Sequence, residues 1–327
     1  MILVTGAAGF IGSNIVAALN AAGSVDVAAC DRLGDGDKWR NLRKAAFADF
    51  VPPDALTAWL AGRERLDAVI HMGAISATTA TDGDLVTETN FRLSLRLLDW
   101  CAATGTPLLY ASSAAVYGDG AQGFADDASL RGVSALRPLN LYGWSKRQFD
   151  LVVADRIAQG GPLPPTCVGF RFFNVFGPNE YHKGDMMSIV AKIAAPIARG
   201  ERITLFKSHR DGIADGDQRR DFVYVRDAVA AVLSFLRPDA GRGIYNIGTG
   251  EARSFRALAE AVFRAHGRAP AIDYVDMPEA IRDKYQYYTE ASLDRLRGAG
   301  YAAPFTPLED AVEDYVRGYL ATDDPYR

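Results

Sequence analysis

Short apolar runs rich in β-branched residues alternate, along the first 113 residues, with stretches whose apolar positions recur at helical spacing. The apolar runs lie at 1–5, 25–30, 66–74 and 107–113, and the main helical stretches lie at 11–23 and 90–105. Strand, helix and strand in this order predict an α/β fold with a parallel sheet and helices on both of its faces.

The pattern changes at about residue 175, where loops rich in glycine, proline and aspartate separate individual helices. A chain of 327 residues favours two domains or one domain with an added lobe. We therefore expect the second part to form a lobe that covers a substrate. Its acidic stretch at 208–218 lacks the glutamate that closes an EF-hand loop, so we predict a solvated loop there and no metal site.

Composition narrows the classes of function. Hydrophobic residues make up 49% of the chain, charged residues 23%, and the formal net charge is -4. This balance lacks the basic surplus typical of nucleic-acid binding, and no apolar run reaches the ~18 residues that a membrane span needs. Cys30, Cys101 and Cys167 lie far apart in apolar stretches, which predicts buried free thiols. Together with an amino terminus that shows no leader pattern, they lead us to expect a reducing cytoplasm.

Three glycines follow the first predicted strand and open the first predicted helix, in VTGAAGFIGSNI. Gly6, Gly9 and Gly12 have the spacing that permits a tight turn, a close backbone approach to a pyrophosphate, and close packing of helix on strand. A glycine triplet alone is weak evidence. However, Asp31 ends the second predicted strand 19 positions after Gly12, near the ~20 expected of an acid that binds ribose. The sequence thus predicts a dinucleotide site.

The residues after this strand bear on which dinucleotide is bound. Asp31 alone favours NAD, because a carboxylate accepts a hydrogen bond from the ribose 2′-hydroxyl and repels a 2′-phosphate. The same segment, CDRLGDGDKWRN, also supplies Arg32, Lys38 and Arg40, which are donors able to hold that phosphate. We therefore expect NADP, with NAD as the open alternative.

A serine, a tyrosine and a lysine further along the chain form a candidate catalytic group. Ser113 ends the apolar run at 107–113, and the carboxyl end of a parallel strand opens onto the ligand crevice. Tyr142 and Lys146 are four apart and share one face of a predicted helix. A phenol has a pKa near 10, and we expect the lysine and a positive nicotinamide ring to lower it. Such a pair alone is common on helix surfaces, so its meaning depends on the glycine turn and the serine.

Together these motifs resemble the extended short-chain dehydrogenase/reductase family, whose members mostly act on nucleotide sugars. VIHMGA, RDFVYVRD (220–227) and YNIGTG (245–250) are also similar to segments of that family, so the resemblance spans essentially the whole chain. It implies an enzyme with a Rossmann-type doubly wound parallel sheet and a smaller α/β substrate-binding domain. The expected NADP-binding domain comprises 1–172 with about 224–252 and 304–320, and the substrate-binding domain comprises about 173–223 and 253–303.

The resemblance also implies roles for individual residues. In the family, serine and tyrosine bind the reacting hydroxyl, and lysine binds the nicotinamide ribose. The implied cofactor-binding residues are Gly6, Gly9, Phe10, Ile11, Gly12, Asp31, Arg32, Lys38, Met72, Gly73, Ala74, Asn90, Tyr142, Lys146 and Val175.

The residues after Ser113 narrow the reaction. Sugar dehydratases of the family carry Asp-Glu there, to supply an acid and a base for the loss of water, whereas this chain has Ala114 and Ala115. Methyl groups cannot transfer protons, so dehydration is disfavoured. Net oxidation or epimerisation remains.

Epimerisation needs a second acid/base group, placed across the substrate from Tyr142. FNVFGPNEYHKGDMMS (173–188) resembles the branch of the family that epimerises carbon 6 of ADP-D-glycero-D-manno-heptose, where a tyrosine and the lysine of a His-Lys-Gly segment form the acid/base pair. Lys183 matches that lysine. The resemblance implies an isomerase that forms a transient ketone, supplies heptose for the lipopolysaccharide inner core and assembles as a homo-oligomer. The implied substrate-binding residues are Ser113, Asn174, Lys183, Asp185, Lys192, Phe206, Arg220 and Tyr285.

Two features of the sequence depart from this branch of the family. Asp185 stands where such epimerases carry serine, and the loop before Arg220 is longer than in some relatives.

A UDP-hexose 4-epimerase would explain Ser113, Tyr142 and Lys146 equally well but would leave the His-Lys-Gly segment without a role. A protein that binds a dinucleotide without catalysis tends to lose the tyrosine or the lysine, and this chain has both.

Overall fold

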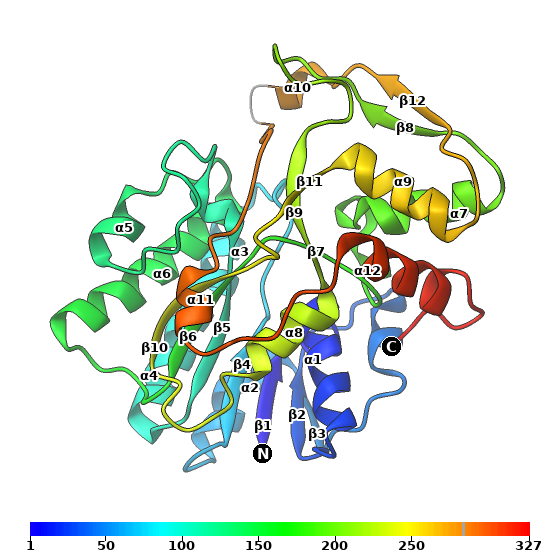
Figure 1. Cartoon of the computed structure of the whole chain (residues 1–327). Helices are drawn as coiled ribbons and strands as arrows, with labels where there is room; N and C mark the ends of the chain where they lie inside the picture. Colours follow the sequence, from blue (N-terminus) through cyan, green and yellow to red (C-terminus); the bar gives the residue numbers. More distant parts are fainter. Residues whose placement is uncertain (283–284) are drawn as a thin grey trace.

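A computed structural model of the chain describes residues 1–282 and 285–327. A parallel seven-stranded sheet forms the centre of the described structure. The strand order is β10-β6-β5-β4-β1-β2-β3 (Figure 1). The strands are β1 (Ile2–Thr5), β2 (Val27–Cys30), β3 (Asp49–Val51), β4 (Ala68–His71), β5 (Leu108–Ser113), β6 (Cys167–Phe172) and β10 (Arg242–Ile247). The predicted α/β class and doubly wound sheet are confirmed.

Helices cover both faces of this sheet because its strands alternate their side chains between two apolar cores. Leu3 belongs to the core that includes Leu97 of α4 and Phe149 of α6, whereas the next residue, Val4, belongs to the core that includes Ile15 of α1. The helices around the sheet are α1 (Phe10–Ala21), α2 (Leu56–Ala61), α3 (Gly83–Val86), α4 (Leu93–Thr104), α5 (Leu130–Ala135), α6 (Leu141–Gln159), α8 (Val225–Leu233) and α11 (Asp294–Gly298). The helix α12 (Leu308–Tyr315) instead packs against the helix Phe255–Ala265.

Two small sheets lie beyond the carboxyl ends of the central strands (Figure 1). One has the order β11-β9-β7 and the other pairs β12 with β8. Their strands and accompanying helices are β7 (Asn174–Phe176), β8 (Ile203–Phe206), β9 (Arg219–Tyr224), β11 (Ala252–Ser254), β12 (Ile272–Val275), α7 (Ile189–Ala198), α9 (Phe255–Ala265) and α10 (Glu279–Arg282). Short helical turns of other types lie at Asp37–Leu42, Pro53–Ala55, Thr87–Arg92, Ala114–Tyr117, Tyr181–Met186 and Val316–Leu320.

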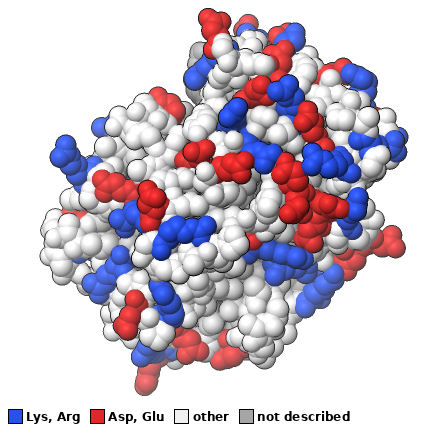
Figure 2. Space-filling view, viewed as in Figure 1, with Lys and Arg blue, Asp and Glu red and all other residues white. Residues whose placement is uncertain are grey.

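Several local predictions can be compared with the structure. The three cysteines are buried free thiols, as predicted. The predicted helix at 90–105 is part of a longer helical stretch, because α3 and the π turn at Thr87–Arg92 precede α4. Acidic and basic side chains are interspersed on the face shown in Figure 2. A search of the described residues found no helix both long and apolar enough to cross a bilayer.

A buried ion pair joins β6 to α6. Arg171 of β6 donates from Nε to Oδ2 of Asp150 of α6 at 3.1 Å, and both side chains are fully buried. The same carboxylate accepts hydrogen bonds from Ser112 Oγ at 2.9 Å and from Tyr110 Oη at 3.2 Å. One carboxylate therefore ties α6 to both β5 and β6.

Replacement of Asp150 by asparagine will leave the Arg171 charge buried without a counterion. We expect the free energy of unfolding to fall by about 3–5 kcal/mol, the usual cost of removing one partner of a buried pair. Urea unfolding followed by circular dichroism measures this change. Asp273→Asn removes one carboxylate from an exposed pair with Arg202 and should leave the unfolding midpoint unchanged. Equal midpoints for the two variants would contradict the structural role of Asp150.

Candidate active site

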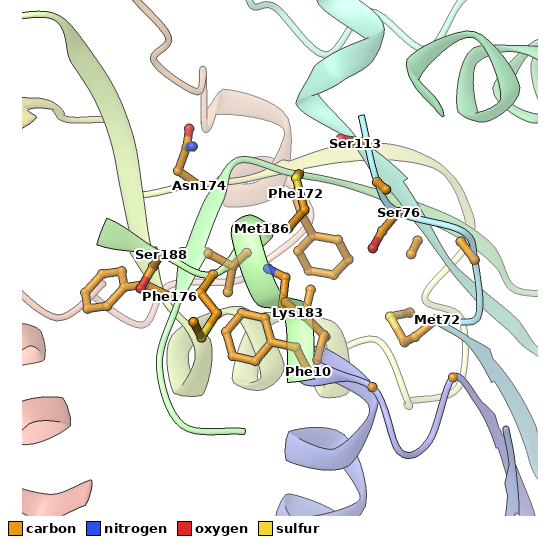
Figure 3. A pocket seen from close by; sticks show the side chains of 18 of the residues that line it. Phe10, Met72, Ser76, Ser113, Phe172, Asn174, Phe176, Lys183, Met186 and Ser188 are labelled. Atoms are coloured by element: carbon orange, nitrogen blue, oxygen red, sulfur yellow. The ribbon is translucent and has the colours of Figure 1, made fainter. Parts of the chain in front are cut away.

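A cavity of about 710 Å³ lies at the carboxyl ends of the central strands. Figure 3 shows it at close range, with Lys183 near its centre. Its wall brings together residues that are far apart in the sequence. The expected site residues that line it are Gly6, Gly9, Phe10, Ile11, Gly12, Asp31, Lys38, Met72, Gly73, Ala74, Ser113, Tyr142, Lys146, Asn174, Val175 and Lys183.

The turn between β1 and α1 is too tight for side chains at two glycines. Gly6 has a φ of +66°, and a Cβ there would lie 2.6 Å from the backbone nitrogen of Gly73. A Cβ on Gly12 would lie 2.0 Å from the carbonyl oxygen of Gly6. Among the described residues, no side chain caps the amino end of α1, so its first N–H groups are available to an anion in the cavity. This end of the cavity fits a pyrophosphate.

Asp31 is held rigidly at the end of β2. Its Oδ2 accepts a hydrogen bond from the Ala8 N–H at 2.8 Å, and its Oδ1 accepts from the Arg32 N–H at 2.7 Å and from Lys38 Nζ at 2.6 Å. The Arg32 guanidinium instead pairs with Asp54 on the surface, and Arg40 pairs with Asp37. Of the three basic residues considered for a 2′-phosphate, only Lys38 lines the cavity.

Ser113, Tyr142 and Lys146 meet where β5 ends beside α6. Lys146 Nζ donates to the carbonyl oxygen of Ala111 at 2.9 Å and lies 6.0 Å from the centroid of the Tyr142 ring. Burial lowers the pKa of Lys146 to about 8, and the negative charge of Asp150 opposes this shift. A pKa of about 8 leaves the lysine mainly protonated at neutral pH.

Within the chain itself, burial dominates the pKa of Tyr142. Burial raises the pKa of its phenol, and the hydrogen bond with Ser113 opposes this shift only in part. The Lys146 ammonium donates its hydrogen bond to the Ala111 carbonyl oxygen. A positively charged nicotinamide ring bound in the cavity would favour the phenolate.

Lys183 reaches the cavity from a different element, the turn Tyr181–Met186. Its Nζ lies 5.0 Å from the centroid of the Phe10 ring, and Figure 3 shows the ammonium pointing into the cavity between Phe10 and Phe172. Burial lowers the pKa of Lys183, Glu180 opposes this shift, and Lys192 adds to it. Lys183 and Tyr142 thus line the same cavity from different elements.

The remaining expected substrate contacts are dispersed. Asn174 lines the cavity, but Figure 3 shows its side chain directed away from Lys183. Lys192 Nζ donates to the carbonyl oxygen of Asp185 at 2.7 Å. Phe206 and Tyr285 meet edge to face with ring centroids 6.4 Å apart.

Arg220 packs against the aromatic ring of Tyr285. Its guanidinium carbon lies 5.1 Å from the centroid of Tyr285 and 5.7 Å from that of Phe255. The side chains of Phe206, Arg220 and Tyr285 thus form a group of their own outside the cavity wall, whereas Phe255 also lines the cavity.

Asn90 was expected to contact the cofactor, but the structure places it behind the cavity wall. Its fully buried amide accepts a hydrogen bond from the Ile75 N–H and donates to the Ile75 carbonyl and to Ser145 Oγ. It therefore supports the loop after β4. Sequence reasoning missed His182, which lines the cavity, although the His-Lys-Gly segment contains it.

The fold and this cavity define an α/β enzyme of the nicotinamide dinucleotide type. Residues 2–248 match the model of the family described as NAD dependent epimerase/dehydratase family. The chain belongs to this family, which confirms the resemblance stated from the sequence.

Individual relatives narrow the comparison. The chain is 46% identical over 329 residues to ADP-L-glycero-D-manno-heptose-6-epimerase of Nitratidesulfovibrio vulgaris (strain DP4), with 100% of both chains covered. It is 44% identical over 335 residues to the enzyme of the same name from Fusobacterium nucleatum subsp. nucleatum, again with 100% of both covered. Among solved structures, the ADP-L-glycero-D-manno-heptose-6-epimerase of Helicobacter pylori superposes with a TM-score of 0.78 at 26% identity, covering 98% of this chain and 96% of that one.

The glycine turn yields a direct test of the cofactor site. Gly12→Ala will force the Gly6 carbonyl to move, and we expect the purified protein to lose at least about nine-tenths of its bound dinucleotide, because α1 can no longer approach the turn. Absorbance of the extracted cofactor measures the stoichiometry. Gly83→Ala, where an added Cβ meets nothing within 4 Å, is the matched control and should retain the cofactor. Full occupancy in Gly12→Ala would contradict the assigned site.

Proposed function

We propose that the chain is an isomerase that converts ADP-D-glycero-D-manno-heptose to ADP-L-glycero-D-manno-heptose by inverting carbon 6. The observation that carries this proposal is the presence of Lys183 in the cavity that also holds Ser113, Tyr142 and Lys146. It is supported by relatives at 42–46% identity over nearly the full length that bear the name of this epimerase. The product would supply heptose for the lipopolysaccharide inner core.

The chain's residues would divide the chemistry between two sides of the cavity. A bound nicotinamide cofactor supplies hydride acceptance from carbon 6 and hydride return to the opposite face. Ser113 and Tyr142 hold the reacting hydroxyl, and either Tyr142 or Lys183 removes its proton as the substrate becomes a ketone. After the ketone turns within the cavity, the other group supplies the proton to the oxygen. Ala114 and Ala115 can move no proton, so elimination of water has no acid or base beside Ser113.

The group of Phe206, Arg220 and Tyr285 would hold the ADP part of the substrate. A guanidinium is planar, always charged, and able to form two parallel hydrogen bonds to phosphate oxygens. Arg220 is only 7% exposed, so its charge lacks full hydration and gains strongly from an anionic partner. Asn174, Asp185 and Lys192 would contact the sugar side of the same substrate.

The decisive test follows carbon 6. We expect the purified wild-type protein, without added cofactor, to convert ADP-D-glycero-D-manno-heptose in proton NMR, because hydride is returned and the net redox change is zero. Lys183→Ala should lower the rate by about 100-fold or more, the usual contribution of an acid/base group. The variant must still contain its dinucleotide and melt at the wild-type temperature.

The alternative substrates complete this test. UDP- and GDP-hexoses are assayed beside the ADP-heptose. Absence of wild-type conversion of the ADP-heptose, with conversion of a UDP-hexose at carbon 4, would overturn the proposed substrate and leave Lys183 without its role.

For the cofactor, we propose NADP held at its 2′-phosphate by Lys38. The ion pair between Lys38 and Asp31 neutralises the carboxylate that would otherwise repel the phosphate. Arg32 would have to leave Asp54 to add a second contact. We also propose that the protein works as a homo-oligomer in the cytoplasm, where its three buried free thiols suit a reducing compartment.

Lys38→Ala separates NADP from NAD. Loss of one charge-assisted contact should weaken NADP binding by about ten-fold, while NAD binding changes by less than about two-fold. Calorimetric titration of the protein stripped of cofactor measures both affinities. Arg40→Ala is the control, since its pair with Asp37 lies on the surface. Equal losses for NADP and NAD in Lys38→Ala would argue against a 2′-phosphate at this position.

A further inference from the structure

One buried carboxylate closes the loop that carries Lys183. Glu180 is fully buried, and its Oε1 accepts hydrogen bonds from the Gly177 N–H at 3.2 Å and from Ser188 Oγ at 2.7 Å. Its Oε2 accepts from the Ser188 N–H at 2.5 Å. Gly177 and Ser188 are the two ends of the loop, so a single side chain fixes the distance that the loop must span.

Glu180 also holds the middle of the loop. Its carbonyl oxygen accepts a hydrogen bond from the Lys183 N–H at 3.0 Å. On its other side, the carboxylate accepts a hydrogen bond from Tyr315 Oη of α12 at 3.2 Å. Lys183 is therefore attached, through Glu180, both to the ends of its own loop and to a helix of the surrounding core.

The charge of this carboxylate is unusual in its surroundings. Its four hydrogen-bond donors are all neutral, and within residues 1–282 and 285–327 no cation lies in salt-bridge contact with it. A buried carboxylate without a charged partner is costly, and the four donated hydrogen bonds offset that cost. Lys183, three residues along the chain, is a cation whose charged form Glu180 favours.

The other titratable groups near Lys183 do not favour its ammonium as Glu180 does. Burial is the main cause that lowers the pKa of His182 to about 4, so its imidazole is neutral at working pH. Burial likewise raises the pKa of Tyr181 and of Tyr315, which keeps both phenols neutral. Lys192 acts in the opposite direction, because its positive charge disfavours the Lys183 ammonium.

We propose that Glu180 is a positioning residue of the active site, which anchors both ends of the 177–188 loop and presents a fixed negative charge to the Lys183 ammonium. The inference rests on the proposed role of Lys183 as an acid/base group. Glu180 is absent from the cavity wall, so we place it as a support for the loop residues that line the cavity, His182, Lys183 and Ser188.

The proposal has an electrostatic half, the effect of the Glu180 charge on Lys183, and an anchoring half, the effect of Glu180 on the loop. A titration of Lys183 tests the electrostatic half without any substrate. Lysines of the cofactor-loaded protein are labelled with ¹³C-methyl groups, and the Lys183 signal is assigned by its absence in Lys183→Ala. Glu180→Gln preserves size and removes charge, so Lys183 should lose its proton at a lower pH than in the wild type. Glu180→Asp keeps the charge and should titrate close to the wild type. An unchanged titration in Glu180→Gln would overturn this half.

Kinetics test the anchoring half. In Glu180→Gln we expect kcat to fall by about ten-fold with KM within about two-fold, and the limb of the pH profile that belongs to Lys183 to move to lower pH. Ser188→Ala removes one donor to Glu180, and also the hydrogen bond that Ser188 Oγ accepts from the Ala191 N–H at the start of α7, while it keeps the charge of Glu180. We expect kcat to fall several-fold while the Lys183 titration stays unchanged. Wild-type kcat in Ser188→Ala would overturn the anchoring half, and this variant serves even where Glu180→Gln fails to fold.

A surface glutamate on α12 provides a control for the loss of one negative charge. Glu313→Gln removes an equal charge from the surface of α12, where Glu313 pairs with Arg317, and should leave kcat and titration unchanged. If the wild type fails to turn over the ADP-heptose while Glu180→Gln still shifts the titration, the proposed function falls and the charge effect of Glu180 remains. If the wild type turns over the ADP-heptose normally and Glu180→Gln does not shift the Lys183 titration, the proposed function stands and the charge effect of Glu180 falls.

Discussion

The fully buried pair of Asp150 and Arg171 constrains the geometry on which the candidate active site depends. Neither charge can return to water without moving β6 or α6, and the surrounding hydroxyls satisfy the carboxylate from the side of β5. Arg171 further donates to Tyr117 Oη at 3.1 Å, and this hydroxyl donates to Asn246 of β10 at 2.7 Å. The network therefore fixes three strands and one helix relative to one another. Ser113 ends one of those strands, and Tyr142 and Lys146 lie on that helix.

The two lysines of the cavity are supported in similar ways. Asp150 lies one helical turn after Lys146 and favours its ammonium, and Glu180 favours the ammonium of Lys183. In both cases the carboxylate is buried and also holds the backbone element that carries the lysine. Burial alone would drive both lysines toward their neutral forms. A buried carboxylate thus sets the position and the charge of each lysine together.

Prediction from sequence succeeded where the determining contacts are local. The glycine turn needs only the spacing of Gly6 and Gly12, and the shared face of Tyr142 and Lys146 follows from helical geometry. Lys183 was found through resemblance, since a lysine in a polar loop has no local feature that directs it into a cavity. Asp150 and Glu180 look like ordinary surface acids in the sequence. Their burial depends on partners such as Arg171 and Tyr315, which are 21 and 135 residues away.

The raised pKa of Tyr142 shows the same limit and bears on the chemistry. Spacing places Lys146 on the same helix face, but it cannot reveal that the ammonium is directed to the Ala111 carbonyl. In the proposed reaction, the proton of the substrate hydroxyl leaves either through a Tyr142 phenolate favoured by cofactor charge or through Lys183. Burial lowers the pKa of Lys183, which brings this lysine closer to exchanging a proton at neutral pH. The loop that carries it is therefore as important to the proposed reaction as the sheet that carries Tyr142.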